Sequence, residues 1–134
     1  MRINNERVVK QFVAEGGAIP VGRIVVWGTA DTGVKLPSGA DVGGIVGIVT
    51  NSPNSGVGDL VEVCMFGATD LNVKAAGTNI AKGDPISIHG TTGSGKKAAP
   101  GAGTNTFLVG FAAEAATADD VLVSVEIIKS VYQG

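Results

Sequence analysis

The strongest constraint on this chain is that its second half repeats its first. Each copy, about residues 18–66 and 79–129, reads as strand, glycine turn, strand, loop and strand. Landmarks of the two copies lie 62, 62, 63 and 62 residues apart, at Gly28/Gly90, Lys35/Lys97, Gly47/Gly110 and Val61/Val123. Short strands separated by turn signals predict a sandwich or barrel. The alternative is that a glycine-rich β sequence looks self-similar without a true repeat.

Composition agrees with a small all-β domain. The chain has 134 residues, of which 21 are glycine, and its aromatic content is only 4%. The glycines follow no collagen period and punctuate short β-branched runs. No helix of three turns is predicted, and only Asp70–Ala76 and Ala112–Ala118 could hold a helical turn. We therefore expect a compact glycine-rich β-sandwich or barrel built from two strand repeats.

Alternation along the predicted strands gives a candidate core shared by both copies, because every second side chain of a strand faces inward. The predicted core residues are Ile24, Val26, Ile45, Ile48, Val61, Val63, Ile86, Ile88, Leu108, Phe111, Val123 and Val125. Cys64, the only cysteine, excludes an internal disulfide and is expected to behave as a small buried hydrophobe.

Bulk properties argue against several classes of partner. The formal net charge is −2, and no cluster of basic residues exceeds the pair Lys96-Lys97, which argues against a nucleic-acid interface. Apolar runs are far shorter than the roughly 20 residues of a membrane helix, and no signal peptide is recognisable. We expect no membrane association, no cofactor and no metal, in a protein made and used in a reducing compartment.

One segment resembles a nucleotide-binding loop. Gly90–Lys97 follows a predicted strand and fits G-x-x-x-x-G-K. A working phosphate loop next needs Ser or Thr, where this chain has Lys97, and it needs a helix, which Pro100 and its neighbouring glycines prevent. We interpret the segment as a flexible hairpin loop and predict no nucleotide binding.

The other candidates for chemistry are weak. His89 is the only histidine and occupies the place that Trp27 has in the first copy, at a strand end where either ring would suit an interface or a packed edge. Asp59 and the pair Asp119-Asp120 precede the last strand of each copy, without the spacing of a calcium loop. We interpret them as strand-entry acids, and we predict no catalytic residues.

The glycine and strand spacing resembles the small capsid decoration (cement) proteins of tailed phages, once described as a domain of unknown function and often mislabelled as RecA/RadA-like recombinases. The resemblance covers about residues 16–129 and rests on Gly22, Gly28, Gly47, Gly58-Asp59, Val61, Val63, Gly83-Asp84-Pro85, Gly110 and the strand Asp120–Val125. It implies a compact, β-tulip-like fold that trimerises on the outside of a phage head, contacting the major capsid protein and sitting in the host cytoplasm before assembly. The family offers no catalytic residues to transfer.

Residues 1–17 differ in composition from the single β domain predicted for residues 18–134, and Gly16-Gly17 separates the two. We interpret 1–17 as an N-terminal arm that docks on the capsid or a neighbouring subunit. Its candidate contact residues are Arg2, Ile3, Arg7, Val8, Val9, Lys10 and Phe12. The alternative is that this segment is the first strand of the same domain.

The sequence therefore predicts a non-enzymatic virion protein that binds the outer surface of a capsid and stabilises the shell. The main alternative is a β-rich surface module that binds carbohydrate or a receptor. Such modules usually present exposed aromatic rings, and here Trp27, Tyr132 and four phenylalanines are the aromatic residues at hand.

Overall fold

The computed structural model of the chain describes residues 7–52 and 60–133. The described part contains strands and turns and no helix. No helix that could cross a membrane is therefore found in it. The strands are β1 (Val8–Ala14), β2 (Ile24–Trp27), β3 (Gly33–Lys35), β4 (Ile45–Asn51), β5 (Leu60–Lys74), β6 (Pro85–Ile88), β7 (Gly95–Lys97), β8 (Asn105–Ala112) and β9 (Asp119–Gln133).

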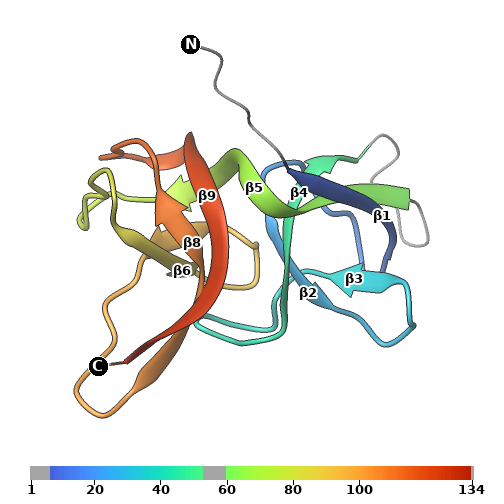
Figure 1. Cartoon of the computed structure of the whole chain (residues 1–134), viewed down its shortest axis with the longest axis horizontal. Helices are drawn as coiled ribbons and strands as arrows, with labels where there is room; N and C mark the ends of the chain where they lie inside the picture. The colour runs from blue at the N-terminus through green and yellow to red at the C-terminus, as the bar shows by residue number, and fades with distance from the viewer. Residues whose placement is uncertain (1–6, 53–59, 134) are drawn as a thin grey trace.

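The strands form two rings that share one long strand (Figure 1). The first ring runs β1-β3-β2-β4-β5 and closes where β1 pairs antiparallel with β5. The second ring runs β5-β7-β6-β8-β9 and closes where β9 pairs antiparallel with β5. Residues 60–66 of β5 belong to the first ring and residues 67–74 to the second. Gly67, with φ of 102°, lies where the strand changes rings. The all-β barrel prediction is confirmed.

The repeat begins earlier than the sequence indicated. In the first ring, Val13 of β1 pairs in parallel with Gly33 of β3. In the second ring, Val73 of β5 pairs in parallel with Gly95 of β7. β1 therefore does for the first ring what the C-terminal half of β5 does for the second. Residues 8–14 are a strand of the first ring, as in the alternative interpretation of the N-terminal segment. The docking of residues 1–17 as an arm stays a prediction.

The apolar residues form two clusters rather than the single shared core that was predicted. The first-ring core contains Phe12, Ala14, Ile19, Val25, Val34, Val46, Val49, Val61 and Val63. The larger junction core joins residues of the second ring to Ile24, Val26, Ile48 and Cys64 of the first. Alternation is the reason, because neighbours on β2 and β4 point to opposite sides. Val61 and Val63 are thus buried away from the second ring.

Most other predicted core residues are buried in the junction core, including Ile86, Ile88, Val123 and Val125, and Leu108 is buried as well. Two of the predicted residues, Ile45 and Phe111, are only partly buried. Cys64 is fully buried, as expected, and burial raises the pKa of its thiol.

Glycine at two repeated positions is required by close backbone approach. A Cβ on Gly47 of β4 would overlap the carbonyl oxygen of Cys64 on β5. A Cβ on Gly110 of β8 would overlap the carbonyl oxygen of Glu126 on β9 in the same way. These two glycines are counterparts in the two copies. Part of the repeated sequence pattern is therefore explained by the close approach of the neighbouring strand, which leaves no room for a Cβ.

Candidate functional site

The segment that resembles a phosphate loop joins the two rings. Residues 90–94 are the turn of the β6–β7 hairpin, in which Ile88 pairs with Gly95. The turn lies against β2 of the first ring: the Ile24 N–H donates to the Gly93 carbonyl at 2.7 Å. Gly93 has φ of 76°, and a Cβ on it would come within 2.7 Å of the Ile24 carbonyl oxygen. The predicted hairpin is confirmed, and its backbone is engaged in contacts within the chain.

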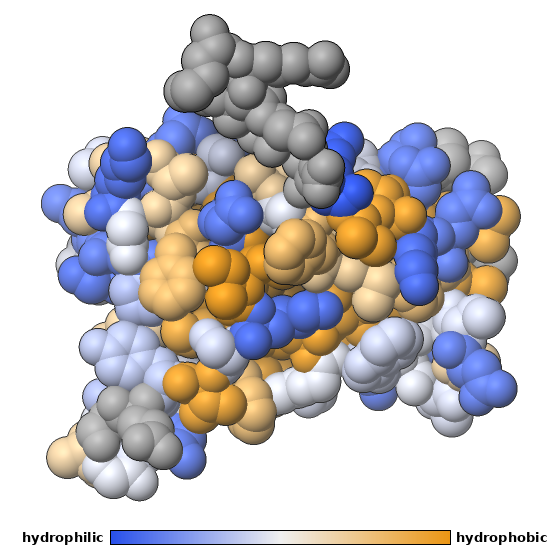
Figure 2. Space-filling view, in the orientation of Figure 1, coloured by the Kyte–Doolittle hydropathy of each residue, from blue (hydrophilic) through white to orange (hydrophobic). Residues whose placement is uncertain are grey.

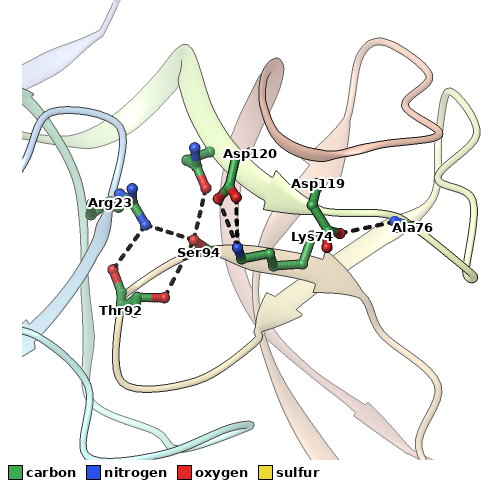
Figure 3. A network of polar contacts seen from close by, with 8 residues as sticks. Arg23, Lys74, Ala76, Thr92, Ser94, Asp119 and Asp120 are labelled. Atoms are coloured by element: carbon green, nitrogen blue, oxygen red, sulfur yellow. Dashed lines mark hydrogen bonds and ion pairs between the residues drawn. The ribbon is translucent and has the colours of Figure 1, made fainter.

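A buried polar network reinforces this junction (Figure 3). The Arg23 guanidinium donates to the Ser94 hydroxyl at 2.8 Å, and that hydroxyl donates to the Asn72 side-chain oxygen at 2.8 Å. Ser94 is fully buried and Asn72 nearly so. Three segments far apart in sequence thus meet through the Ser94 hydroxyl, which has a partner on each side.

The lysines beside this turn are paired with carboxylates. Lys96 lies 3.1 Å from Asp41, and Lys97 lies 3.5 Å from Asp84. Both line a cavity of about 480 Å³ together with Lys74, Ala76, Thr78, His89, Ala99 and Asp119. Because each lysine has an acidic partner, the charge around the cavity is balanced rather than strongly basic.

The strand-entry acids have structural partners. Asp120 forms an ion pair with Lys74 at 2.8 Å, and the hydrogen bond from Lys74 lowers the pKa of the Asp120 carboxyl. Asp119 accepts a hydrogen bond from the Ala76 N–H at 3.0 Å. Asp59 lies outside the described residues. Within residues 7–52 and 60–133, no group of three potential metal ligands comes together.

Sequence reasoning missed the role of Glu15. Its carboxylate accepts hydrogen bonds from the Thr29 and Ala30 N–H groups, at 2.9 and 3.1 Å, in the turn between β2 and β3. These backbone hydrogen bonds lower the pKa of Glu15. Gly28 and Gly33 leave room for the carboxylate, because a Cβ on either would collide with it. No local pattern around Glu15 indicated a partner 14 residues away.

The predicted arm residues differ in how exposed they are in the structure. Val8, Val9 and Lys10 are exposed on β1, and Arg7 is exposed just before it. Phe12 is buried in the first-ring core and packs edge-on against Trp27, with ring centroids 5.8 Å apart. Phe12 is therefore withdrawn from the contact set, because its side chain is committed to its own ring. Arg2 and Ile3 lie outside the described residues.

Exposed apolar side chains cross the junction of the rings on one face, and we call this row the junction stripe. Val8 of β1 pairs with Phe66 of β5. Gly67 of β5 pairs with Ile127 of β9, so Phe66 and Ile128 come directly after the last pair of these two strands. All three side chains are exposed. Figure 2 shows apolar side chains gathered across the middle of the face that carries β9 and β5.

A groove of about 260 Å³ lies between the start of β4 and the end of β9, and we call it the β9 groove. It is lined by Gly44, Ile45, Phe107, Leu108, Lys129, Ser130 and Val131. Phe107 and Val131 are opposite each other on β8 and β9, and both are exposed. This groove could not be predicted from the sequence, because its two walls come from different copies of the repeat.

Comparison with known proteins agrees with this architecture. No curated protein matches the chain. Among solved structures, the N base of the head fiber protein gp8.5 of bacteriophage phi29 is similar, with a TM-score of 0.56 and 18% sequence identity. The match covers 96% of this chain and 100% of that one. At this identity the likeness concerns the fold.

A family model supplies the assignment. The model described as phage cement protein matches residues 3–127, which include β1 to β8 and the part of β9 that pairs with β5. The match takes in most of the glycines that carry the resemblance seen in the sequence, Gly47 and Gly110 among them. The chain therefore belongs to the phage cement protein family and is a structural protein of the phage virion.

Proposed function

We propose that this protein binds the outer surface of a phage capsid and stabilises the shell. The observation that supports this most directly is the junction stripe. Val8, Phe66 and Ile128 come from three adjacent strands and remain exposed although the chain has two apolar cores in which to bury such residues. Contiguous exposed apolar surface is typical of a docking site.

The two-ring body suits such a role. β5 runs through both rings, and the contacts of Ile24 and Arg23 with residues 93–94 hold the second hairpin on the first ring. A rigid body loses little conformational freedom on binding. Repetition over a symmetric lattice then lets many modest contacts reinforce the shell.

We further propose that the major capsid protein and other copies of this chain, as a homotrimer, are the partners. Arg2, Ile3, Arg7, Val8, Val9 and Lys10 remain the proposed contacts of the N-terminal segment. No catalytic role enters this proposal, because the candidate groups His89, Asp119 and Asp120 lie beside paired charges and a balanced cavity.

Heads assembled without this protein provide the test. Purified protein is added, bound copies are quantified after sedimentation, and the temperature at which the heads release DNA is recorded. We expect saturable binding and a higher release temperature. The double variant Phe66→Ser, Ile128→Ser should bind more weakly, and Val21→Ser, which changes an exposed valine in a turn away from the stripe, should not.

Other results would redirect the proposal. Binding without any change in the release temperature would argue against stabilisation. Failure to bind heads, together with binding on a glycan array, would favour the carbohydrate-binding alternative. Light scattering of the free protein tests the trimer separately.

A further inference from the structure

The C-terminal part of β9 has an open edge. Up to Ile127, β9 lies between β5 and β8. Beyond Ile127, β5 turns away into the first ring, and residues 130–133 pair with β8 and with no other strand of the described residues. No described residue forms a backbone hydrogen bond to the other edge of this stretch. An unpaired edge presents N–H and C=O groups that a further strand can use.

A bulge between Leu108 and Gly110 of β8 interrupts the pairing opposite residues 128–129, so the regular part of this edge is residues 130–133. Residues 128–133 contain no proline, and Ser130 to Gln133 pair regularly with β8. Lys129 is the one charged residue of the stretch, but its ammonium group donates to the Val46 carbonyl of β4 at 2.9 Å. The Lys129 side chain is thus turned toward the first ring, and residues 130–133 carry no charged side chain.

The β9 groove lies beside this edge and is shaped for side chains of an extended segment. Ile45 forms one wall, and Phe107 and Val131 form the other. The Phe107 ring rests near Gly43, where a Cβ would come within 3.1 Å of it, so glycine keeps the groove open at that end. Strand addition of this kind combines backbone hydrogen bonds with pockets for alternate side chains.

The charge of the groove indicates what would fill it. Among the described residues, Lys129 is the one charged residue that lines the groove. No carboxylate of the described residues forms an ion pair with it, and desolvation lowers the pKa of its ammonium group. Lys129 is exposed, so an incoming carboxylate could reach its ammonium group and supply an ion-pair partner.

Two occupants from this chain fit poorly. Its N-terminal residues Met1–Arg7 carry two arginines and one glutamate, so they would bring positive charge to Lys129. The β9 edge of a second copy carries the same lysine and is flanked by its own first ring (Figure 1).

We propose that the β9 groove accepts an extended segment of the capsid shell protein, added as a strand to the edge of residues 128–133, with a carboxylate side chain that reaches Lys129 and apolar side chains at alternate positions. This inference rests on the proposed function and adds to it a specific docking site and the chemistry of the segment it takes.

Hydrogen exchange and charge reversal test the inference on intact heads assembled without this protein. In the wild-type protein, amide exchange within residues 128–133 should slow at least tenfold on binding. Lys129→Glu should weaken binding at least tenfold, and Lys82→Glu, an equal change of charge at an exposed turn, should leave it within twofold. Val131→Lys, at an exposed groove position, should also weaken binding while keeping the wild-type melting temperature. This variant keeps the test valid if Lys129→Glu disturbs the fold.

Cross-linking from position 131 identifies the shell segment, and reversing its acidic residue to lysine should restore binding of Lys129→Glu. If the wild-type protein binds heads but residues 128–133 gain no protection, or if both groove variants bind as the wild type does, the inference is overturned and the proposed function stands. If the wild-type protein fails to bind heads, the proposed function itself fails, and the inference with it.

Discussion

The two rings follow one plan, yet their corresponding hairpin turns are held differently. In the first ring, the β2–β3 turn is fixed from within by the Glu15 carboxylate. In the second ring, the β6–β7 turn is fixed from outside, by Arg23 and Ile24 of the first ring. The first ring thus holds its own turn, and the second relies on the first. The strands and the steric glycines occur in both copies of the repeat. The polar contacts that hold each turn differ between the two copies.

The largest effect is expected from removing β1. Deleting residues 2–14 takes away the strand that closes the first ring, together with the buried side chains of Phe12 and Ala14. We expect loss of the cooperative thermal melt followed by circular dichroism. Deleting only residues 2–6 should preserve it. A folded 2–14 deletion that no longer binds heads would instead restore the arm interpretation for the whole segment.

The steric glycines should matter equally in both rings. Gly47→Ala and Gly110→Ala each place a Cβ against a backbone carbonyl that side-chain motion cannot relieve. Each should cost about 3 kcal/mol or more of unfolding free energy, at the upper end for overpacking. Gly39→Ala, where a Cβ meets nothing within 4 Å, is the control. Chemical denaturation measures all three. A large loss for only one of the two glycines would show that the rings differ in their backbone packing as well.

Much of this arrangement could be predicted from the sequence, because the alternation of side chains along a strand is a local pattern. Alternation placed Ile86, Ile88, Val123 and Val125 correctly in a core. β1 was harder to place, since its first four residues are exposed and Gly16-Gly17 suggested a boundary after it. β7 has only three residues and was predicted as part of a loop.

The candidate site was less predictable than the fold. The partners of Arg23, Glu15 and Lys129 include backbone groups or side chains reached only through the fold, up to 83 positions away for Lys129 and Val46. A residue type carries no local signal of such a partner. The β9 groove was missed for the same reason. Neither of the segments that line it has a sequence pattern that predicts a groove, and only the fold brings them together.

The dependence of the second ring on the first can be measured at Ser94. Ser94→Ala removes the hydroxyl that joins Arg23 to Asn72, which leaves buried polar groups without their partner. We expect a loss of about 1–3 kcal/mol. Ser87→Ala is a matched control, because Ser87 is also fully buried but its hydroxyl has no hydrogen-bond partner among the described residues. Equal losses of unfolding free energy in the two variants would mean that the network does not hold the hairpin. Calorimetry of Ser94→Ala would then show one unfolding transition for both rings.

The smallest effect is expected from the turn of the first ring, and it should depend on pH. The backbone hydrogen bonds from Thr29 and Ala30 hold the pKa of Glu15 below its ordinary value of 4.5. The folded state therefore binds this proton less readily than the unfolded chain does. The resulting stabilisation is present above pH 4.5 and is lost as the pH falls through the lower folded-state pKa.

Glu15→Gln removes that ionisation while keeping a side-chain oxygen near the turn. The wild type should melt at a slightly higher temperature than this variant at neutral pH, and the difference should shrink as the pH falls below 4.5. Comparing the two proteins at each pH cancels the titration of the other carboxyl groups. Glu126→Gln, an exposed change on β9, is the control, and at neutral pH it should lower the melting temperature less than Glu15→Gln does. A constant difference between the wild type and Glu15→Gln from pH 7 to pH 3 would show that the charge of Glu15 does not hold the turn. In that case, the charge of Glu15 would not distinguish how the turn of the first ring is held from how the turn of the second ring is held.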